Sequence, residues 1–309
     1  MKIATVIPSY NAENYIADAL TSVLNQTEQV HEIIVVDDCS TDSTRGVASN
    51  FPVTLLKTKE NLGHANARNV ALDATDADII FWLDADDTWE PEHVETLLSL
   101  TRDFPEADVV YSGIKWFGLK NHQWSNFPCE RAPKHLTIES FERTLVPAMS
   151  VATRTIALRN IGGFNAQIRY APDFDLWLRM SLASKFVCTS KITANYRTHD
   201  SQISSQPIRQ IKSVYAARMR FLSNARENDP LLACKLERKL EEIVHTDLAD
   251  AWNRRQGERL RFLYHFSQTF GYKHVHRRYF VKRVVPMQAI RAYDKLQALL
   301  HSRPTGDSR

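Results

Sequence analysis

The sequence predicts an α/β fold, in which a mostly parallel sheet is flanked by helices and followed by a C-terminal α-helical extension. Three observations support this prediction. Short apolar runs alternate with helical patterns through the first hundred residues, as in parallel, doubly wound sheets. Clusters of polar residues directly follow three of these runs. Beyond His199, the strand-like runs give way to amphipathic helical patterns.

Four strands are expected in the first hundred residues, each a short run of mainly apolar residues. The last of them contains Ile79-Ile80-Phe81-Trp82-Leu83 without interruption, which is the pattern of a strand buried on both faces. The expected strands are Ile3–Pro8, Glu32–Asp37, Val53–Thr58 and Ile79–Asp84.

Helical patterns separate these strands. Between the first two, Ala12–Asn25 carries apolar side chains at helical spacing. A short helix is expected at Asp42–Asn50, behind a cluster of Ser, Thr and Asp residues, and another at His64–Asp73. Between residues 100 and 199 the pattern is mixed, with strands expected at Val109–Tyr111 and Thr193–Arg197 and a helix at Asp173–Ala183.

The composition is that of a soluble globular protein. The 309 residues are 43% hydrophobic and 24% charged, which provides ample material for a core. No apolar stretch approaches the roughly 20 residues that a membrane-spanning helix needs, and no charged leader with an apolar core precedes the first strand. The cysteines are scattered without a C-x-x-C pair, which argues against a zinc site and gives no disulfide framework. A reduced, cytoplasmic setting is therefore expected. The cysteines are Cys39, Cys129, Cys188 and Cys234.

The net charge of +3 hides an asymmetry between the two parts of the chain. Residues 200–309 contain 21 Lys and Arg against 11 Asp and Glu, whereas residues 1–199 contain 18 against 25. The two parts are thus expected to face different partners. For the basic helical part, three alternatives stay open: packing on the first domain or a second subunit, peripheral contact with the inner face of an anionic membrane, and nucleic-acid binding. The last is disfavoured because no recognisable nucleic-acid module accompanies the charge.

Polar clusters follow the first, second and fourth expected strands. They are Ser9-Tyr10-Asn11, Asp37-Asp38-Cys39-Ser40 and the acidic segment Asp84 to Asp87. Parallel sheets bind ligands at the carboxyl ends of their strands, so these clusters are expected to form one site. Three close carboxylates repel one another unless a cation lies among them, and a hard divalent cation takes oxygen ligands and bridges to phosphates. The alternative is a turn that only caps the next helix.

Seven motifs in order give the chain a resemblance to a known family. They are V-I-P-S-Y-N (6–11), V-V-D-D-C-S-T-D (35–42), N-L-G-H-A-N-A-R-N (61–69), L-D-A-D-D (83–87), I-G-G-F-N (161–165), P-D-F-D-L-W-L-R (172–179) and Y-R-T-H (196–199). With this order and spacing, residues 1 to about 200 resemble the family-2 glycosyltransferases of the GT-A fold. The resemblance implies a catalytic domain at 1–200, with a nucleotide-sugar half (1–100) and an acceptor half (101–200), before a basic helical region at 201–309.

The resemblance implies roles in binding a nucleotide diphosphate-sugar donor. Asp38 resembles the carboxylate that reads the base, with Pro8 and Tyr10 lining the same pocket. Arg68 is a natural cation for the nucleotide or diphosphate, and Asp84 resembles the first Asp of a D-x-D motif, which holds ribose or sugar hydroxyls. Capping of the turn that follows the second strand is the alternative for Asp38.

The resemblance also implies a divalent cation, Mn²⁺ or Mg²⁺, that would neutralise charge on the departing diphosphate. Asp86 resembles the last Asp of D-x-D, which binds the metal. His199 resembles a His that joins the metal or the diphosphate in some relatives. Asp87 is left open between support of the metal ligands and a helix cap.

Asp173 resembles the catalytic base of the family, which deprotonates the acceptor hydroxyl in an inverting transfer. Pro172 stands where the family commonly has Glu, although Pro suits the first turn of a helix. Asp175 better fits a carboxylate that only favours a helix N-terminus. Trp177 is expected in the core, with stacking on a sugar as the alternative.

The implied activity is transfer of a sugar, from a donor whose base is expected to be uracil, to a hydroxyl acceptor in cell-surface polysaccharide or glycolipid biosynthesis. The acceptor would be a carbohydrate or a lipid-linked molecule, and a homo-oligomer is compatible with the sequence. A non-catalytic nucleotide-sugar-binding protein on the same fold is one alternative. A sugar nucleotidyltransferase is another, although Ser9–Asn14 lacks the Gly, Arg and Lys of its phosphate loop.

Overall fold

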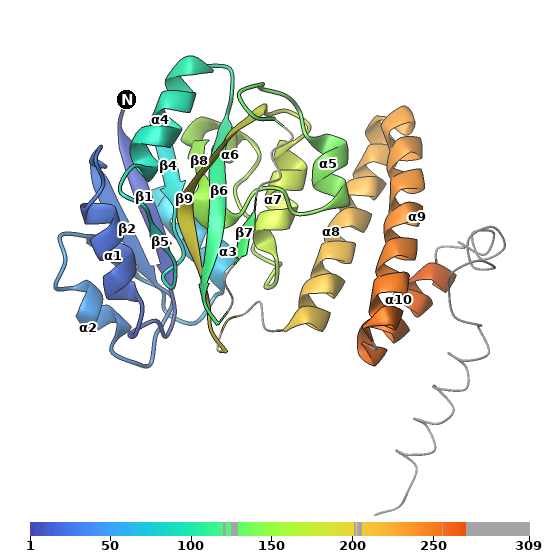
Figure 1. The fold of residues 1–309 in the computed structure, drawn as a ribbon, viewed down its shortest axis with the longest axis horizontal. Coiled ribbons are helices and arrows are strands. Elements are labelled where there is room, and N and C mark those ends of the chain that lie inside the picture. Colours follow the sequence, from blue (N-terminus) through green and yellow to red (C-terminus); the bar gives the residue numbers. More distant parts are fainter. Residues whose placement is uncertain (120–121, 125–128, 201, 203–205, 255, 270–309) are drawn as a thin grey trace, which may run out of the picture. The chain divides into compact units, whose positions relative to one another are not determined.

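A computed structural model describes residues 1–119, 122–124, 129–200, 202, 206–254 and 256–269 (Figure 1). The chain divides into two compact units, Met1–Asn224 and Ala225–Arg309. Each unit is described by itself below.

The first four strands are parallel neighbours in one sheet, as the sequence predicts. Strand β1 pairs with β2 on one side and β4 on the other, and β2 pairs with β3. The carboxyl ends of β1, β2 and β4 therefore meet at one edge of the sheet. The strands are β1 (Ile3–Ser9), β2 (Glu32–Asp37), β3 (Thr54–Lys57) and β4 (Ile79–Trp82).

The second half extends this sheet with mixed directions, to give the order β3-β2-β1-β4-β8-β6-β9-β5, with β7 paired to β6. Strand β8 is antiparallel to both β4 and β6, whereas β6 and β9 are parallel to each other. The predicted parallel arrangement is thus confirmed for β1–β4, and the complete sheet is mixed. The added strands are β5 (Thr88–Trp89), β6 (Val109–Gly118), β7 (His122–Trp124), β8 (Val151–Arg154) and β9 (Phe186–Thr198).

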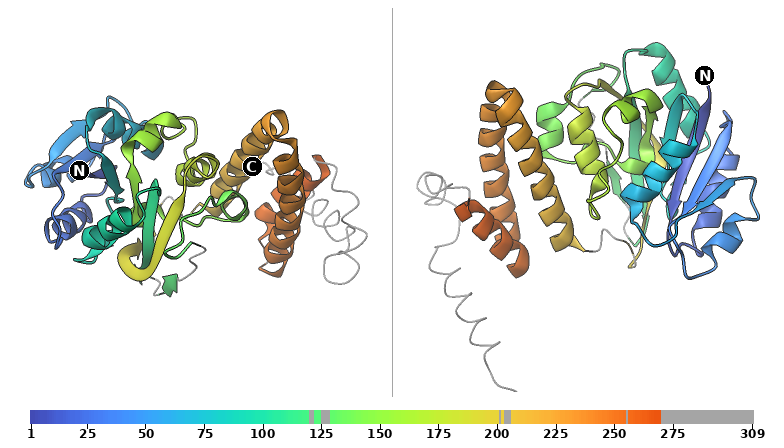
Figure 2. Two further views of the ribbon diagram at one scale, coloured as in Figure 1. Left: turned by 90° about the horizontal axis from the view of Figure 1, so that it is seen from above. Right: turned by 180° about the vertical axis from the view of Figure 1, so that it is seen from behind.

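Helices cover both faces of the sheet (Figure 2). Buried side chains of α1 (Ile16–Leu24), α2 (Thr44–Ala48) and α4 (His93–Asp103) form one core with one face of the sheet. Those of α3 (His64–Ala74), α6 (Thr155–Asn160) and α7 (Pro172–Met180) form the other. The central strand β4 is buried along its whole length, which explains its unbroken apolar sequence. Short helices α5 (Thr137–Glu142) and η1 (Ala148–Ser150) complete this half.

The first compact unit extends beyond residue 200 because helix α8 (Pro207–Asn228) packs on it through residues before 225. Tyr215 and Arg218 of α8 are buried. The Arg218 guanidinium donates to the carbonyl oxygens of Phe141 and Glu142 at 2.8 and 2.7 Å. The start of the region expected to be a separate basic extension therefore belongs structurally to the first unit.

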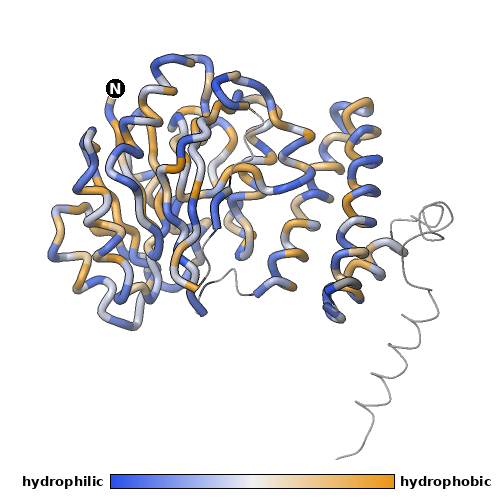
Figure 3. Tube along the Cα trace, viewed as in Figure 1, coloured by the Kyte–Doolittle hydropathy of each residue, from blue (hydrophilic) through white to orange (hydrophobic). Residues whose placement is uncertain are grey.

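The described part of the second unit contains α9 (Pro230–Asn253) and α10 (Gly257–Thr269), which pack on each other. Apolar and polar stretches alternate along α9 in Figure 3, as expected for an amphipathic helix. Residues 225–269 contain eight basic and eight acidic residues. The excess of positive charge that prompted the membrane alternative thus falls mainly in 270–309, outside the described residues. Within the described residues, no helix has the length and hydropathy needed to cross a membrane.

Candidate functional site

The segments that follow β1 and β2 are joined side by side. The Asn11 main-chain N–H donates to Ser40 Oγ at 3.0 Å, and Asn11 Oδ1 accepts from the Thr41 main-chain N–H at 2.9 Å. Asn11 has φ +48°, a left-handed conformation that Asn tolerates better than most residues. Of the two residues expected to line a base pocket here, Pro8 is buried within β1 and Tyr10 is 47% exposed.

Asp38 is buried at the end of β2 and organises the segment that leads into α3. Its Oδ1 accepts from Thr58 Oγ1 and from the Leu62 main-chain N–H, both at 2.9 Å, and its Oδ2 accepts from the Gly63 main-chain N–H at 2.7 Å. A carboxylate offers about four acceptor positions. With these three bonds, Asp38 keeps capacity for one further donor.

Arg68 and Asp84 form an ion pair between α3 and the acidic turn after β4. The side chain of Arg68 is only 4% exposed, and that of Asp84 is 29% exposed. The Arg68 guanidinium also lies 5.4 Å from the centre of the Phe164 ring, in the I-G-G-F-N motif. Three segments that are far apart in the sequence thus converge on Arg68, and its Nε has no hydrogen-bond partner among the described residues.

Asp86 and His199, the two expected metal ligands, lie together. His199 Nε2 is 3.0 Å from Asp86 Oδ2, and both side chains are partly exposed. Burial, followed by the charge of Asp84, raises the pKa of the Asp86 carboxyl, while His199 opposes that rise. The His199 ring also lies 4.5 Å from the ring of Tyr15, at the start of α1.

Asp87 and Arg197 connect the acidic turn to the end of β9. The Arg197 main-chain N–H donates to Asp87 Oδ1, and Arg197 Nε donates to the Asp86 carbonyl oxygen, both at 2.8 Å. The Arg197 guanidinium also pairs with Asp18 of α1 and lies over the rings of Tyr15 and Phe117. The Asp87 side chain is buried and accepts from the Arg197 main chain, two residues before His199, so the geometry favours support of its neighbours over a helix cap.

Asp173 lies in the first turn of α7, after Pro172 at the first helical position and Ala171 in a left-handed conformation with φ +52°. Burial raises the pKa of the Asp173 carboxyl; the positive charge of Arg68 lowers it and the negative charge of Asp84 raises it. Asp173 therefore shares its electrostatic environment with the Arg68–Asp84 pair. A carboxylate with a raised pKa is a better proton acceptor than an ordinary one.

Two other residues of this segment are structural. Asp175 is buried and forms ion pairs with Arg179 at 2.8 Å and with Arg220 of α8 at 3.2 Å. It thereby ties α7 to α8, which is more than the expected role at a helix N-terminus. Trp177 is 3% exposed and belongs to the core around α3 and α7, as expected.

His64 was not singled out from the sequence, yet it lies among the candidate site residues. It is the first residue of α3, one helical turn before Arg68, so the two side chains lie on one face of the helix. Burial, followed by the positive charge of Arg68, lowers the pKa of His64, and Asp84 and Asp38 act in the opposite direction. The imidazole is therefore neutral at pH 7. In the sequence, the position of His64 directly after Gly63, at the start of a predicted helix, was the signal that could have pointed to a place in the site.

Asn69 of the A-R-N sequence has a structural role that the motif alone did not reveal. Its Oδ1 accepts from the Phe164 main-chain N–H at 2.9 Å, and its Nδ2 donates to the Phe164 carbonyl oxygen at 2.8 Å. These two hydrogen bonds to Phe164 fix the I-G-G-F-N segment against α3. They thereby hold the Phe164 ring beside Arg68.

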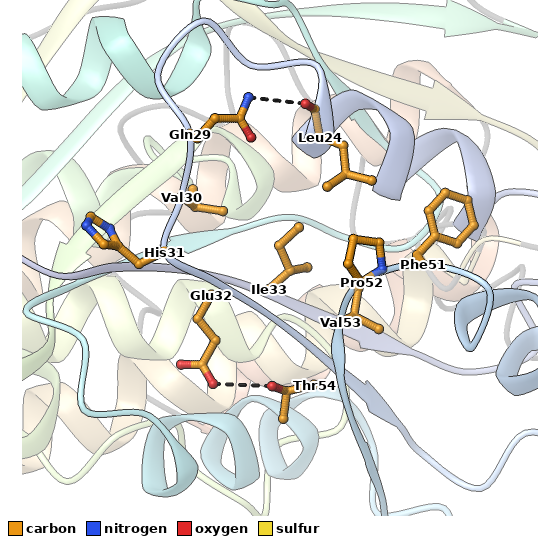
Figure 4. A pocket seen from close by; sticks show the side chains of 10 residues that line it. All are labelled: Leu24, Gln29, Val30, His31, Glu32, Ile33, Phe51, Pro52, Val53 and Thr54. Carbon is orange, nitrogen blue, oxygen red and sulfur yellow. Dashed lines mark hydrogen bonds between the residues drawn. The ribbon is translucent and has the colours of Figure 1, made fainter.

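A cavity of about 440 Å³ lies elsewhere, at the opposite end of the sheet (Figure 4). It is lined by Glu32 and Thr54, the first residues of β2 and β3, and by apolar side chains that include Phe51. Its walls contain none of the candidate site residues.

Within the described residues, no cluster of three or more His, Cys, Asp or Glu side chains has the arrangement of a complete metal site. Asp86 and His199 provide two adjacent donor atoms, an oxygen and a nitrogen. Mg²⁺ is commonly held by one or two carboxylates, with substrate phosphates and water completing its shell, and imidazole is a common ligand of transition metals. The donor set thus fits a cation that is completed by a substrate.

Comparisons with solved structures identify the fold. Residues 1–349 of TarS from S. aureus, in complex with UDP-GlcNAc, match with a TM-score of 0.64 and 21% identity, over 79% of this chain and 71% of that one. The mannosyltransferase PcManGT from Pyrobaculum calidifontis, in complex with GDP-Man and Mn²⁺, matches with a TM-score of 0.59 and 17% identity, over 96% of this chain and 80% of that one. The expected GT-A fold is confirmed.

Sequence comparisons identify the family. TuaG of Bacillus subtilis, a glycosyltransferase named for teichuronic acid biosynthesis, is 29% identical over 229 residues, which are 69% of this chain and 85% of TuaG. A family model described as glycosyl transferase family 2 matches residues 5–160, just over half of the chain. The chain therefore belongs to glycosyl transferase family 2.

Proposed function

We propose that this family-2 glycosyltransferase is a metal-dependent, inverting enzyme that transfers a sugar from a nucleotide diphosphate donor to a hydroxyl acceptor. The observation that carries the proposal is the convergence of the Arg68–Asp84 pair, the Asp86–His199 pair and Asp173 at the carboxyl edge of the sheet.

The donor would lie along this edge. Tyr10 offers an exposed ring for stacking on the base, and Asp38 keeps one acceptor position for a base N–H. Arg68 would bind the diphosphate, and Asp84 would accept hydrogen bonds from ribose or sugar hydroxyls. A UDP-sugar is the first donor to test, because TarS binds UDP-GlcNAc on the same fold. GDP-sugars come next, since PcManGT binds GDP-Man.

Asp86 and His199 would hold Mn²⁺ or Mg²⁺ together with oxygens of the diphosphate. When bound, such a cation supplies positive charge opposite the departing diphosphate, where negative charge develops. The complex of PcManGT with Mn²⁺ supports this proposal by analogy of fold.

Asp173 would act as the general base. In an inverting transfer, the acceptor oxygen attacks the anomeric carbon on the face opposite the diphosphate. The bond from that carbon to the diphosphate breaks, the diphosphate leaves with the electron pair, and the carboxylate takes the hydroxyl proton. The raised pKa of Asp173 suits this role. The neighbouring positive charge of Arg68 opposes that rise and favours the ionised form of the carboxyl, which is the form that accepts a proton.

The acceptor would be a carbohydrate or a lipid-linked saccharide of a cell-surface polysaccharide or glycolipid. Partly exposed rings of Trp116 and Tyr196, 6.1 Å apart on β6 and β9, are suited to contact a sugar face. TuaG supports the assignment to polysaccharide biosynthesis. A cytoplasmic enzyme with peripheral contact at the inner face of the membrane remains our proposal for its location, with residues 270–309 as the basic segment.

The test is release of free nucleoside diphosphate from a panel of UDP-, dTDP- and GDP-sugars, with Mn²⁺, with Mg²⁺ and with EDTA. We expect release from one donor class, abolished by EDTA and restored by either cation. Undiminished release in EDTA would exclude the metal. Binding of a donor, read by thermal shift, without any release under any condition would favour a non-catalytic binder. Once an acceptor is known, the anomeric configuration of the product decides between inversion and retention.

A further inference from the structure

Two cysteines that are far apart in the sequence meet in the core of the first unit. Cys129 Sγ and Cys188 Sγ are 3.3 Å apart, and both residues are 0% exposed. The backbone also pairs at this point: the Cys188 N–H donates to the Cys129 carbonyl at 3.2 Å, and the Arg131 N–H donates to the Cys188 carbonyl at 3.0 Å. The two thiols are therefore held together by the backbone on both sides.

A third polar group faces this pair. Tyr111 Oη, which is also buried, lies 3.4 Å from Cys129 Sγ. Hydrogen bonds from Cys129 and then from Tyr111 lower the pKa of the Cys188 thiol, against the effect of burial. The pKa of Cys129 moves in the opposite direction, because its proton is shared with Cys188 and because it is buried. These contacts favour the thiolate of Cys188 over that of Cys129, and the thiolate is the nucleophilic form of a cysteine.

We propose that Cys129 and Cys188 form a reversible disulfide when the protein meets a peroxide. The geometry carries this inference: two buried thiols in contact, on backbone segments that are already paired, need only small side-chain movements to reach a bonding distance. Among the cysteines of the chain, Cys39 lies partly exposed after β2 and Cys234 lies exposed on α9, so neither competes for this pair.

The chemistry balances with hydrogen peroxide as the oxidant, whose small size suits a buried pair. The Cys188 thiolate attacks one peroxide oxygen, the O–O bond breaks, and the leaving hydroxide takes a proton to become water. The resulting sulfenic acid is attacked by Cys129, which forms the S–S bond and releases the second water. Overall, two thiols lose two protons and two electrons, and one peroxide becomes two waters.

The disulfide would join the segment after β7 to the start of β9 and close a loop over residues 129–188. This loop contains β8, α7 and the proposed base Asp173. Since a cross-link restricts the unfolded chain more than the folded one, oxidation is expected to stabilise this half of the sheet. We expect the Tm of the first unfolding transition to rise by roughly 5–10 °C.

The test uses the full-length chain with and without hydrogen peroxide, followed by unfolding, alkylation and peptide mapping. We expect a cross-linked peptide that contains Cys129 and Cys188, that is lost with dithiothreitol, and a matching loss of alkylation at both sites. The Cys39→Ser/Cys234→Ser variant should show the same cross-link and the same rise in Tm. In Cys129→Ser, Cys188 should gain no intramolecular partner and the rise in Tm should vanish.

Wild-type protein also contains its own dose control, because the exposed Cys234 reports that the peroxide has acted. Full alkylation of Cys129 and Cys188 at a dose that oxidises Cys234 would disprove the proposal. A sulfinic acid on Cys188 in place of the cross-link would do the same. Peptide mapping of the wild-type chain decides the question even if the Ser variant does not fold, and it does not depend on the proposed transferase activity.

Discussion

Arg197 and Asp86 join the end of β9 to the acidic turn after β4: Arg197 Nε donates to the Asp86 carbonyl oxygen at 2.8 Å. The Arg197 main chain holds Asp87 at the same distance, and its guanidinium reaches Asp18 of α1. His199, two residues further along, contacts the Asp86 carboxylate. A single arginine therefore sets the position of the turn relative to the strand that carries His199.

This geometry predicts that Arg197→Lys weakens metal binding without unfolding the protein. Lysine keeps the positive charge but cannot bond the Asp86 carbonyl and Asp18 together while lying flat on the Tyr15 and Phe117 rings. We expect the Mn²⁺ concentration for half-maximal activity to rise about 10- to 100-fold, as for other residues that orient metal ligands. Arg102→Lys, at an exposed ion pair with Glu28, is the control and should leave the Mn²⁺ titration unchanged. An unchanged titration in Arg197→Lys would remove the positioning role.

Asp173→Asn should lower kcat by about 10²- to 10⁴-fold while donor affinity stays nearly unchanged. Only the carboxylate accepts a proton, and burial raises its pKa above the ordinary 3.8. The wild-type rate should therefore fall as the pH drops through this raised pKa, and the variant should lack that acid limb. The exposed Asp73→Asn on α3 is a matched control that should keep both the rate and the limb. A persistent acid limb in Asp173→Asn would assign it to another group.

Arg68 and Asp84 should be coupled in donor binding. Arg68→Ala leaves the Asp84 carboxylate without its partner, and we expect the donor KM to rise about 10-fold or more, the loss typical of a charge-assisted hydrogen bond. If both residues bind the same donor, the double variant with Asp84→Asn should lose less than the sum of the two single losses. Arg45→Ala, at an exposed position of α2, should leave the donor KM unchanged. If the two single losses added up strictly in the double variant, Arg68 and Asp84 would contribute to donor binding independently of each other.

The first half of the fold could be predicted because its residues carry local periodicity. In α1, the buried Ile16, Ala19, Leu20 and Val23 follow the helical spacing read from the sequence. Strand β8 was missed because its sequence, Val151–Arg154, shows neither an alternation of apolar and polar residues nor an unbroken apolar run like that of β4. Only its pairing between β4 and β6 makes it a strand.

Site residues at strand ends could be predicted from the sequence. Residues whose roles depend on contacts between distant segments could not. Asp86 and His199 came from motifs, and they do lie together. The three donors that bind Asp38, and the two bonds from Asn69 to Phe164, connect segments that no local pattern relates. His64 and Arg197 were overlooked for the same reason, since their roles arise from neighbours on other elements.

His93 should make the protein less stable in mild acid. It is fully buried, its Nδ1 lies 2.7 Å from Thr193 Oγ1, and burial lowers its pKa from 6.5 to about 3. Below pH 6.5 His93 is protonated in the unfolded chain but stays neutral in the folded chain. The free energy of unfolding therefore decreases as the pH is lowered from 6.5 to about 3. Between pH 7 and pH 5 this one residue should lower the free energy of unfolding by about 2 kcal/mol.

Urea denaturation of wild type and His93→Gln at both pH values measures this contribution. The variant should lose less stability between pH 7 and pH 5 than wild type does, even if it is less stable at pH 7. His135→Gln removes an exposed histidine and serves as the control for the change of residue type. Parallel pH dependence in wild type and His93→Gln would show that the buried imidazole does not drive the acid sensitivity.

Gly163→Ala should be strongly destabilising, in contrast to Gly46→Ala. Gly163 has φ +65°, and an added Cβ would lie 2.7 Å from Asn69 Oδ1 and 3.1 Å from Leu72 Cδ2. The left-handed conformation alone costs a non-glycine residue about 1 kcal/mol. The contact of the added Cβ with Asn69 Oδ1 must also disturb the two hydrogen bonds between the Asn69 side chain and the Phe164 main chain. We expect a loss of about 2 kcal/mol or more in the free energy of unfolding. Gly46 has open space around its Cβ position and lies in helix α2, so alanine there should be neutral or stabilise by up to about 1 kcal/mol. If urea denaturation gave the same change in the free energy of unfolding for both substitutions, the hydrogen-bonded contact between Asn69 of α3 and Phe164 would not be a rigid part of the fold.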